Sequence, residues 1–155
     1  MSESLINPNY TLLDLSAKVE YALIALLELA NHSTDKTPIT MSDISGKHPI
    51  PERYLEQILT SLRRAGVVQS QRGSKGGFLL VREPWQLTLL EVVVMLEGEQ
   101  KDRDSSSEEY LEKNLVRNIW HQADLASQAV LSQYTIQDLC EQQQARLQRN
   151  QMYYI

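Results

Sequence analysis

Residues 40–81, TMSDISGKHPIPERYLEQILTSLRRAGVVQSQRGSKGGFLLV, decide the fold of this chain. Thr40 and Asp43 have the spacing of a helix capping box, with Asp in place of the usual Glu. Pro51 suits the first turn of a second helix, because its missing N–H has no helical partner there. Gly66 can cap the end of that helix. Between Pro51 and Gly66, apolar residues recur at helical spacing and fall on one face of the helix: Leu55, Ile58, Leu59 and Leu62. The stretch predicts a short helix, a turn and an amphipathic helix.

A β-hairpin follows the second helix. We expect strands at residues 67–72 and 78–81, joined by the glycine-rich turn Gly73-Ser-Lys-Gly-Gly77. This turn is not a P-loop, because it leads into a strand rather than a helix. Two helices followed by a glycine-tipped hairpin are typical of a winged helix-turn-helix, so we predict a mainly α fold with a small β-hairpin wing.

The charge of the chain is unevenly distributed. The net charge is −5, yet residues 1–84 carry nine acidic and nine basic residues, and the whole excess of acid lies in residues 85–155. Within residues 47–82 there are two acidic residues and seven basic ones: Lys47, Arg53, Arg63, Arg64, Arg72, Lys75 and Arg82. A local basic patch is what phosphate binding requires, whatever the sign of the whole chain. This pattern favours double-stranded DNA as the ligand.

Three polar residues lie opposite the apolar stripe of the second helix. Arg53 can pair with guanine and Gln57 with adenine, and Glu56 can accept from cytosine. In the hairpin, Arg72 and Lys75 suit the backbone or a narrow minor groove, which attracts arginine. The alternative is a winged helix that binds another protein, with these residues as a solvated basic face. Likewise, Arg63 and Arg64 could interact with the negative C-terminal end of the helix dipole instead of binding phosphate.

The segments outside residues 40–81 also predict helices. Ser16 begins a helix, Thr88 and Glu91 form a capping box for one that ends at Gly98, and Thr135 with Asp138 caps the last one. A long helix over 110–133 has one apolar side: Leu111, Leu115, Ile119, Ala123, Ala126 and Val130. Homodimerisation would cover this stripe, and packing back on the wing domain is the alternative. Trp120 is interpreted as a packing residue.

We therefore divide the chain into three parts. Residues 1–98 form the winged helix-turn-helix DNA-binding domain with an N-terminal arm. Residues 99–109 are an acidic, serine-rich loop that we expect to be mobile. Residues 110–155 form the dimerisation helix and the C-terminal helix.

Other functional classes find little support in the sequence. Three scattered histidines without a nucleophile partner do not suggest an enzyme, and there is neither a membrane span nor a signal peptide. A single cysteine, Cys140, fits a reducing, cytoplasmic compartment. Within a helix it is interpreted as a small apolar residue, and a metal or redox role is the alternative.

Several runs resemble the Rrf-two family of bacterial transcriptional regulators. They are Leu15-Ser-Ala-Lys-Val-Glu-Tyr-Ala-Leu23, Tyr54-Leu-Glu-Gln-Ile-Leu59, Leu62-Arg-Arg-Ala-Gly-Val67 and Ser70-Gln-Arg-Gly-Ser-Lys-Gly-Gly-Phe78, and the resemblance extends over about residues 12–140. It implies a homodimeric repressor or activator that reads a palindromic operator, with the long helix crossing to the partner subunit.

The resemblance also implies roles for individual residues. Glu56 and Gln57, with Arg53 near them, fall where the recognition helix of the family meets bases, and Arg72 falls where its wing enters the minor groove. Lys18 and Tyr21 fall on the first helix near the DNA backbone. Tyr54 and Ser74, which lie in the same matching runs as the recognition helix and the wing, complete the set of DNA-binding candidates together with Lys75.

The sequence departs from the family at the iron–sulfur site. Cluster-binding members place three cysteines between the segments matching Gly98 and Trp120, and this chain has none there. The histidine that one member adds is Arg117 here. Iron–sulfur clusters require thiolate-rich ligands, so we predict no cofactor. An atypical cluster held by Cys140 from two chains, with a ligand such as His121, stays open. An effector protein or small molecule, or no signal at all, is the favoured alternative.

Overall fold

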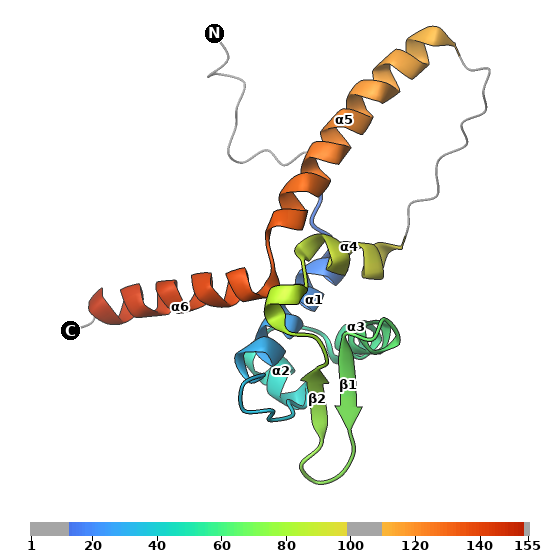
Figure 1. Ribbon diagram of the computed structural model, residues 1–155. Helices are drawn as coiled ribbons and strands as arrows, with labels where there is room; N and C mark the ends of the chain where they lie inside the picture. The colour runs from blue at the N-terminus through green and yellow to red at the C-terminus, as the bar shows by residue number, and fades with distance from the viewer. Residues whose placement is uncertain (1–12, 99–109, 154–155) are drawn as a thin grey trace.

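The computed structural model describes residues 13–98 and 110–153. Its elements are, in chain order, α1 (Ala17–Asn31), α2 (Met41–Lys47), α3 (Glu52–Arg64), β1 (Val68–Gln71), β2 (Gly77–Leu80), the 3-10 helix η2 (Pro84–Gln86), α4 (Leu89–Glu97), α5 (Leu111–Gln133) and α6 (Ile136–Tyr153). The predicted mainly helical fold with one hairpin is confirmed (Figure 1). The predicted loop at 99–109 lies outside the described residues.

The helices begin where the capping signals predicted. Ser16 Oγ accepts from the Val19 N–H at 3.2 Å, and Thr40 and Asp43 exchange both bonds of the capping box at 3.0 Å. Thr88 with Glu91 does the same for α4. One boundary shifts slightly: Pro51 is the residue before α3 rather than part of its first turn, and its carbonyl accepts from the Leu55 N–H.

The end of α3 is a Schellman motif. Gly66 has a φ of +78°, which L side chains rarely adopt, and this lets the Val67 N–H reach the Leu62 carbonyl at 3.0 Å. The chain reverses within these residues and enters β1 directly. Helix α3 and the hairpin are therefore joined without a flexible linker.

The hairpin is antiparallel, and its register runs from Val68 opposite Leu80 to Gln71 opposite Gly77. A third segment, which the sequence did not reveal, pairs with it: Ile39 and Phe78 exchange backbone bonds at 3.0 and 2.8 Å. Gly77 makes this approach possible, because a Cβ there would lie 2.8 Å from the Ile39 backbone and the φ of Gly77 is +153°. The wing is therefore tied to the segment that precedes α2.

One hydrophobic core joins most elements, including the start of α6. Ile136 and Cys140 belong to the same buried cluster as residues of α1, α3 and α4. The junction between α5 and α6 is held to the start of α4 by two backbone bonds, Leu89 N–H to the Tyr134 carbonyl at 2.9 Å and Ile136 N–H to the Leu87 carbonyl at 3.0 Å. The predicted boundary at residue 110 stays a prediction, but the first turns of α6 pack against α1.

Helix α5 projects away from this core (Figure 1). No residue of α5 is buried, and its packing is mainly against α4. In the described parts of the chain, none of the helices combines the length and apolar character needed to cross a membrane.

Candidate nucleic-acid interface

Helix α3 is strongly two-sided. Its buried face carries the four predicted apolar residues, each at most 1% exposed: Leu55, Ile58, Leu59 and Leu62. Arg53, Glu56 and Gln57 are exposed on the outer side. Burial of the apolar face anchors the helix, so the outer side chains are presented to solvent on a fixed backbone. This is the geometry that a major-groove reading helix needs.

The wing lies beside α3, and its turn projects from the helical body (Figure 1). Arg72, Ser74 and Lys75 are all exposed in that turn, between β1 and β2. Two residues before Arg72, within β1, Ser70 Oγ accepts from Arg63 Nη1 at 3.5 Å, so α3 and β1 are also linked by side chains. The wing residues and the outer side of α3 therefore belong to one supported unit.

Two predicted residues of α1 have partners within the chain. The ring of Tyr21 packs edge-on against that of Tyr54 of α3, with centroids 6.2 Å apart. Lys18 is exposed, and its Nζ donates to the Leu96 carbonyl in the last turn of α4 at 3.0 Å. Tyr21 and Tyr54 are thus brought together, whereas Lys18 is held at the end of α4.

The seven basic residues of 47–82 divide into two groups. Lys47, Arg63 and Arg82 bond to Glu28, Ser70 and Glu91, respectively. The remaining four have no polar partner among the described residues: Arg53, Arg64, Arg72 and Lys75. A cation with no intramolecular partner can meet a phosphate without first losing an ion pair. The carboxylates of Glu28 and Glu91 offset the charges of Lys47 and Arg82, whereas Arg63, whose partner is a neutral hydroxyl, keeps its charge. The remaining positive surface is centred on α3 and the wing.

A buried carboxylate lies behind the helix-turn-helix. Glu28 of α1 is 7% exposed, and its two oxygens accept from His48 Nε2 at 2.9 Å and Lys47 Nζ at 3.3 Å. Burial alone would raise the pKa of Glu28, but the hydrogen bond from His48 and the charge of Lys47 outweigh it and hold this pKa below its usual value. No local sequence signal predicts this cluster, since nothing relates Glu28 to residues twenty positions later.

The residues present do not fit the three-cysteine cluster site of the resembling proteins. The chain has one cysteine, Cys140, which is buried in α6. Burial, followed by the charge of Glu141, raises the pKa of the Cys140 thiol and disfavours the thiolate that a cluster needs. His121 is exposed on another helix, α5. Among the described residues, no three or more His, Cys, Asp or Glu side chains are grouped so as to hold a metal ion.

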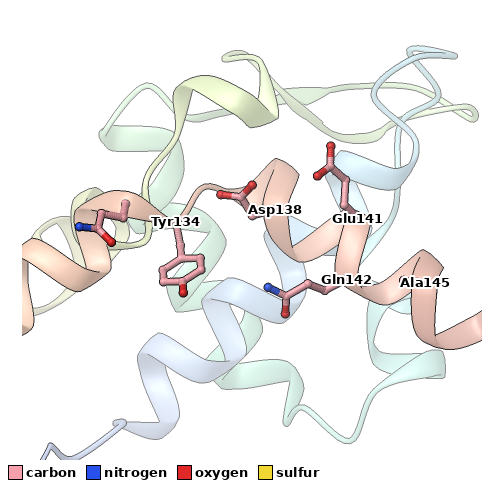
Figure 2. A pocket seen from close by; sticks show the side chains of 6 residues that line it. Tyr134, Asp138, Glu141, Gln142 and Ala145 are labelled. Atoms are coloured by element: carbon pink, nitrogen blue, oxygen red, sulfur yellow. The ribbon is translucent and has the colours of Figure 1, made fainter.

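A shallow pocket lies where α5 meets α6, away from α3 and the wing (Figure 2). Its labelled residues include Tyr134, Asp138 and Glu141. The Asp138 carboxylate already accepts from the Thr135 N–H at 2.8 Å as the cap of α6. The pocket therefore adds nothing to the nucleic-acid interface.

Comparison with known proteins places the chain in a family. Residues 15–142 match the Rrf2 (Rrf-two) family model, described as an iron-dependent transcriptional regulator. The transcriptional regulator CymR of Bacillus subtilis is 33% identical over 125 residues, covering 81% of this chain and 88% of CymR. An rrf2-like regulator of Rhodobacter capsulatus is 41% identical over 86 residues, covering 54% of this chain and 57% of that protein. This chain thus spans just over half of the Rhodobacter relative.

Solved structures agree with these sequence matches. The structure of CymR, described as the global cysteine regulator of B. subtilis, superposes with a TM-score of 0.71 at 32% identity, covering 84% of this chain and 98% of that one. The structure of IscR from T. potens gives a TM-score of 0.70 at 30% identity, covering 84% of this chain and 88% of that one. The family consists of transcriptional regulators rather than enzymes. This chain belongs to the Rrf2 family and is a winged helix-turn-helix DNA-binding transcriptional regulator.

Proposed function

We propose that this protein is a sequence-specific regulator that binds a palindromic operator as a homodimer and does so without an iron–sulfur cluster. The observation that carries the proposal is the outer side of α3, where Arg53, Glu56 and Gln57 are exposed over a fully buried apolar face. In this proposal they read base edges in the major groove, where each has a matching base.

The wing supplies the second part of the proposed contact. Arg72 would enter the minor groove beside the recognition helix, with Ser74 and Lys75 at the backbone. The support is their exposure in the projecting turn and the lack of an intrachain partner for Arg72 and Lys75 in the described segment. Tyr21 and Tyr54 would lie along the adjacent DNA backbone. Lys18 would contact a phosphate near the end of α4, where its Nζ also donates to the Leu96 carbonyl.

Homodimerisation is supported by the surface of α5. Leu115 is 55% exposed, Ile119 61% and Trp120 71%, although a stripe of this length is normally covered. A second copy is the simplest cover, and a two-fold axis would place two recognition helices on two equivalent half-sites. The operator is therefore expected to be palindromic.

Independence from a cluster rests on the donor set. One buried cysteine with a raised pKa is a poor substitute for three thiolates. The regulatory signal in this proposal is an effector protein or a small molecule. If Cys140 did support a cluster, the protein purified without oxygen would contain iron and absorb visible light, and Cys140→Ala would lose both.

The experiment that tests the proposal is selection of genomic fragments with the purified protein, with and without anaerobic cluster reconstitution. We expect the same palindromic sequence to be enriched in both arms, with the protein colourless and free of iron. Enrichment only after reconstitution would overturn cluster independence. No enrichment over random DNA in either arm would overturn sequence-specific binding and favour a winged helix that binds another protein.

A further inference from the structure

The Glu28 clamp, formed by Glu28, Lys47 and His48, connects α1 to the turn of the helix-turn-helix. Glu28 is buried in α1, as are the next two residues of that helix, Leu29 and Ala30. Burying a carboxylate is unfavourable unless donors satisfy it, and a well-packed apolar residue at such a place is often equally stable. Unlike an apolar side chain, the carboxylate fixes the positions of two donors, because each of its oxygens accepts from a different one.

The chain between the clamp and the recognition helix is short and stiff. The Ile50 N–H donates to the His48 carbonyl at 2.7 Å, and the Ile50 side chain is buried. Pro49 and Pro51 fix their own φ angles. Helix α3 then begins at Glu52, one residue before Arg53. A displacement of His48 would therefore be passed to the start of α3 rather than absorbed by a flexible loop.

We propose that Glu28 is a positioning residue for operator recognition: by holding His48 and Lys47 it fixes the start of α3, and so the placement of Arg53, Glu56 and Gln57 against bases. The inference rests on the proposed function. It concerns sequence-specific binding, because base contacts require the correct placement of α3, whereas contacts of the wing with phosphates tolerate small shifts.

The probes are two duplexes of equal length: the most enriched fragment from the genomic selection and a random sequence. Five variants are compared with the unchanged protein, namely Glu28→Gln, His48→Ala, the double variant of these two, His48→Gln and Asp138→Asn. Asp138→Asn is the matched control, because it removes another carboxylate that accepts from backbone and side chain, at the start of α6 and away from the clamp. Circular dichroism establishes that each variant is folded at the binding temperature.

We expect Glu28→Gln and His48→Ala each to weaken binding of the enriched duplex by about tenfold, and binding of the random duplex by less than about threefold. His48→Gln keeps an N–H donor, so its affinities for the two duplexes should stay near those of the unchanged protein. The double variant Glu28→Gln/His48→Ala should bind no more weakly than the weaker single variant, because one substitution removes the charged acceptor and the other the donor of the same contact. Asp138→Asn should leave the ratio of the two affinities unchanged.

The proposal is overturned if folded Glu28→Gln and His48→Ala keep the affinity ratio of the unchanged protein, or if the effects of the two substitutions simply add. If Glu28→Gln does not fold, His48→Ala and His48→Gln decide the matter alone. If the unchanged protein enriches no duplex, the proposed function fails first and this inference falls with it.

Discussion

At the scale of single residues, the structure separates cations that stabilise the fold from cations that are available to a ligand. Arg82 illustrates the first group: its Nη2 lies 3.1 Å from Glu91 and donates to the Gln86 carbonyl at 2.7 Å. Arg72 and Lys75, which have no polar partner in the described segment, illustrate the second. A count of charges along the sequence cannot make this distinction, because the pairing depends on the fold.

Arg72→Ala and Lys75→Ala should each weaken binding of the enriched duplex by roughly tenfold, since each removes a charge-assisted hydrogen bond to DNA. For every phosphate that a variant no longer neutralises, the slope of log affinity against log salt should become shallower by about 0.9. The measurement is a binding titration at several salt concentrations. Arg146→Ala, an exposed arginine on α6, is the control and should change neither quantity. An unchanged slope in both wing variants would rule out binding of phosphates by the wing.

Gly77→Ala should lower the free energy of unfolding by about 2 kcal/mol or more, because the new Cβ would lie 2.8 Å from the Ile39 backbone at a φ of +153°. Gly46→Ala is the matched control: no atom lies within 4 Å of its new Cβ, and alanine favours the helix by up to about 1 kcal/mol. Urea unfolding measures both. Equal stability of the two variants would contradict the close packing of the wing against Ile39.

At the scale of elements, sequence signals were sufficient where the cause is local. The capping residues Ser16, Thr40 and Thr88 lie within three positions of the N–H groups they accept from, so the starts of α1, α2 and α4 could be predicted. The pairing of Ile39 with Phe78 could not, because no periodicity links positions so far apart. The same holds for the bond of Lys18 to the end of α4, which joins residues 78 positions apart.

Glu28→Gln should also lower the free energy of unfolding, because it disrupts the Glu28 clamp. The pKa of Glu28 is lowered in the folded chain, so its ionisation contributes stability that is complete above the unfolded value of about 4.3 and is lost as the pH falls through the folded value. Near neutral pH the variant should be less stable by about 1–3 kcal/mol. This difference should shrink as the pH falls from the unfolded value through the lowered folded value. Urea unfolding at a series of pH values tests this, and a constant difference would contradict it.

At the scale of the whole molecule, the core and α5 differ in how far their apolar residues are buried. The core closes around α1, α3, α4 and the start of α6 within one chain, whereas α5 leaves its apolar stripe exposed (Figure 1). The sequence predicted the length and the apolar side of α5 because both are periodic along one helix. The described residues leave that side uncovered, and homodimerisation remains a proposal.

Leu115→Glu should shift the protein from dimer to monomer and raise the dimer dissociation constant by at least about thirtyfold, since a charge would replace a central apolar side chain. The matched control is Leu147→Glu on α6, because Leu147 is equally exposed, at 55%. Sedimentation velocity over a range of concentrations gives the constant. If the Leu115 variant stays as dimeric as the control, α5 does not form the dimer interface at this position.

The central claim is that α3 reads a DNA sequence through its outer side chains. The most direct measurement is the affinity of the purified protein and of Gln57→Ala for the enriched duplex and for the same duplex with single base pairs changed. We predict that the unchanged protein discriminates at one symmetric pair of positions by about tenfold or more and that Gln57→Ala loses this discrimination there alone. Equal discrimination by both proteins at every position would contradict the assignment of Gln57, and no discrimination by the unchanged protein would contradict the central claim.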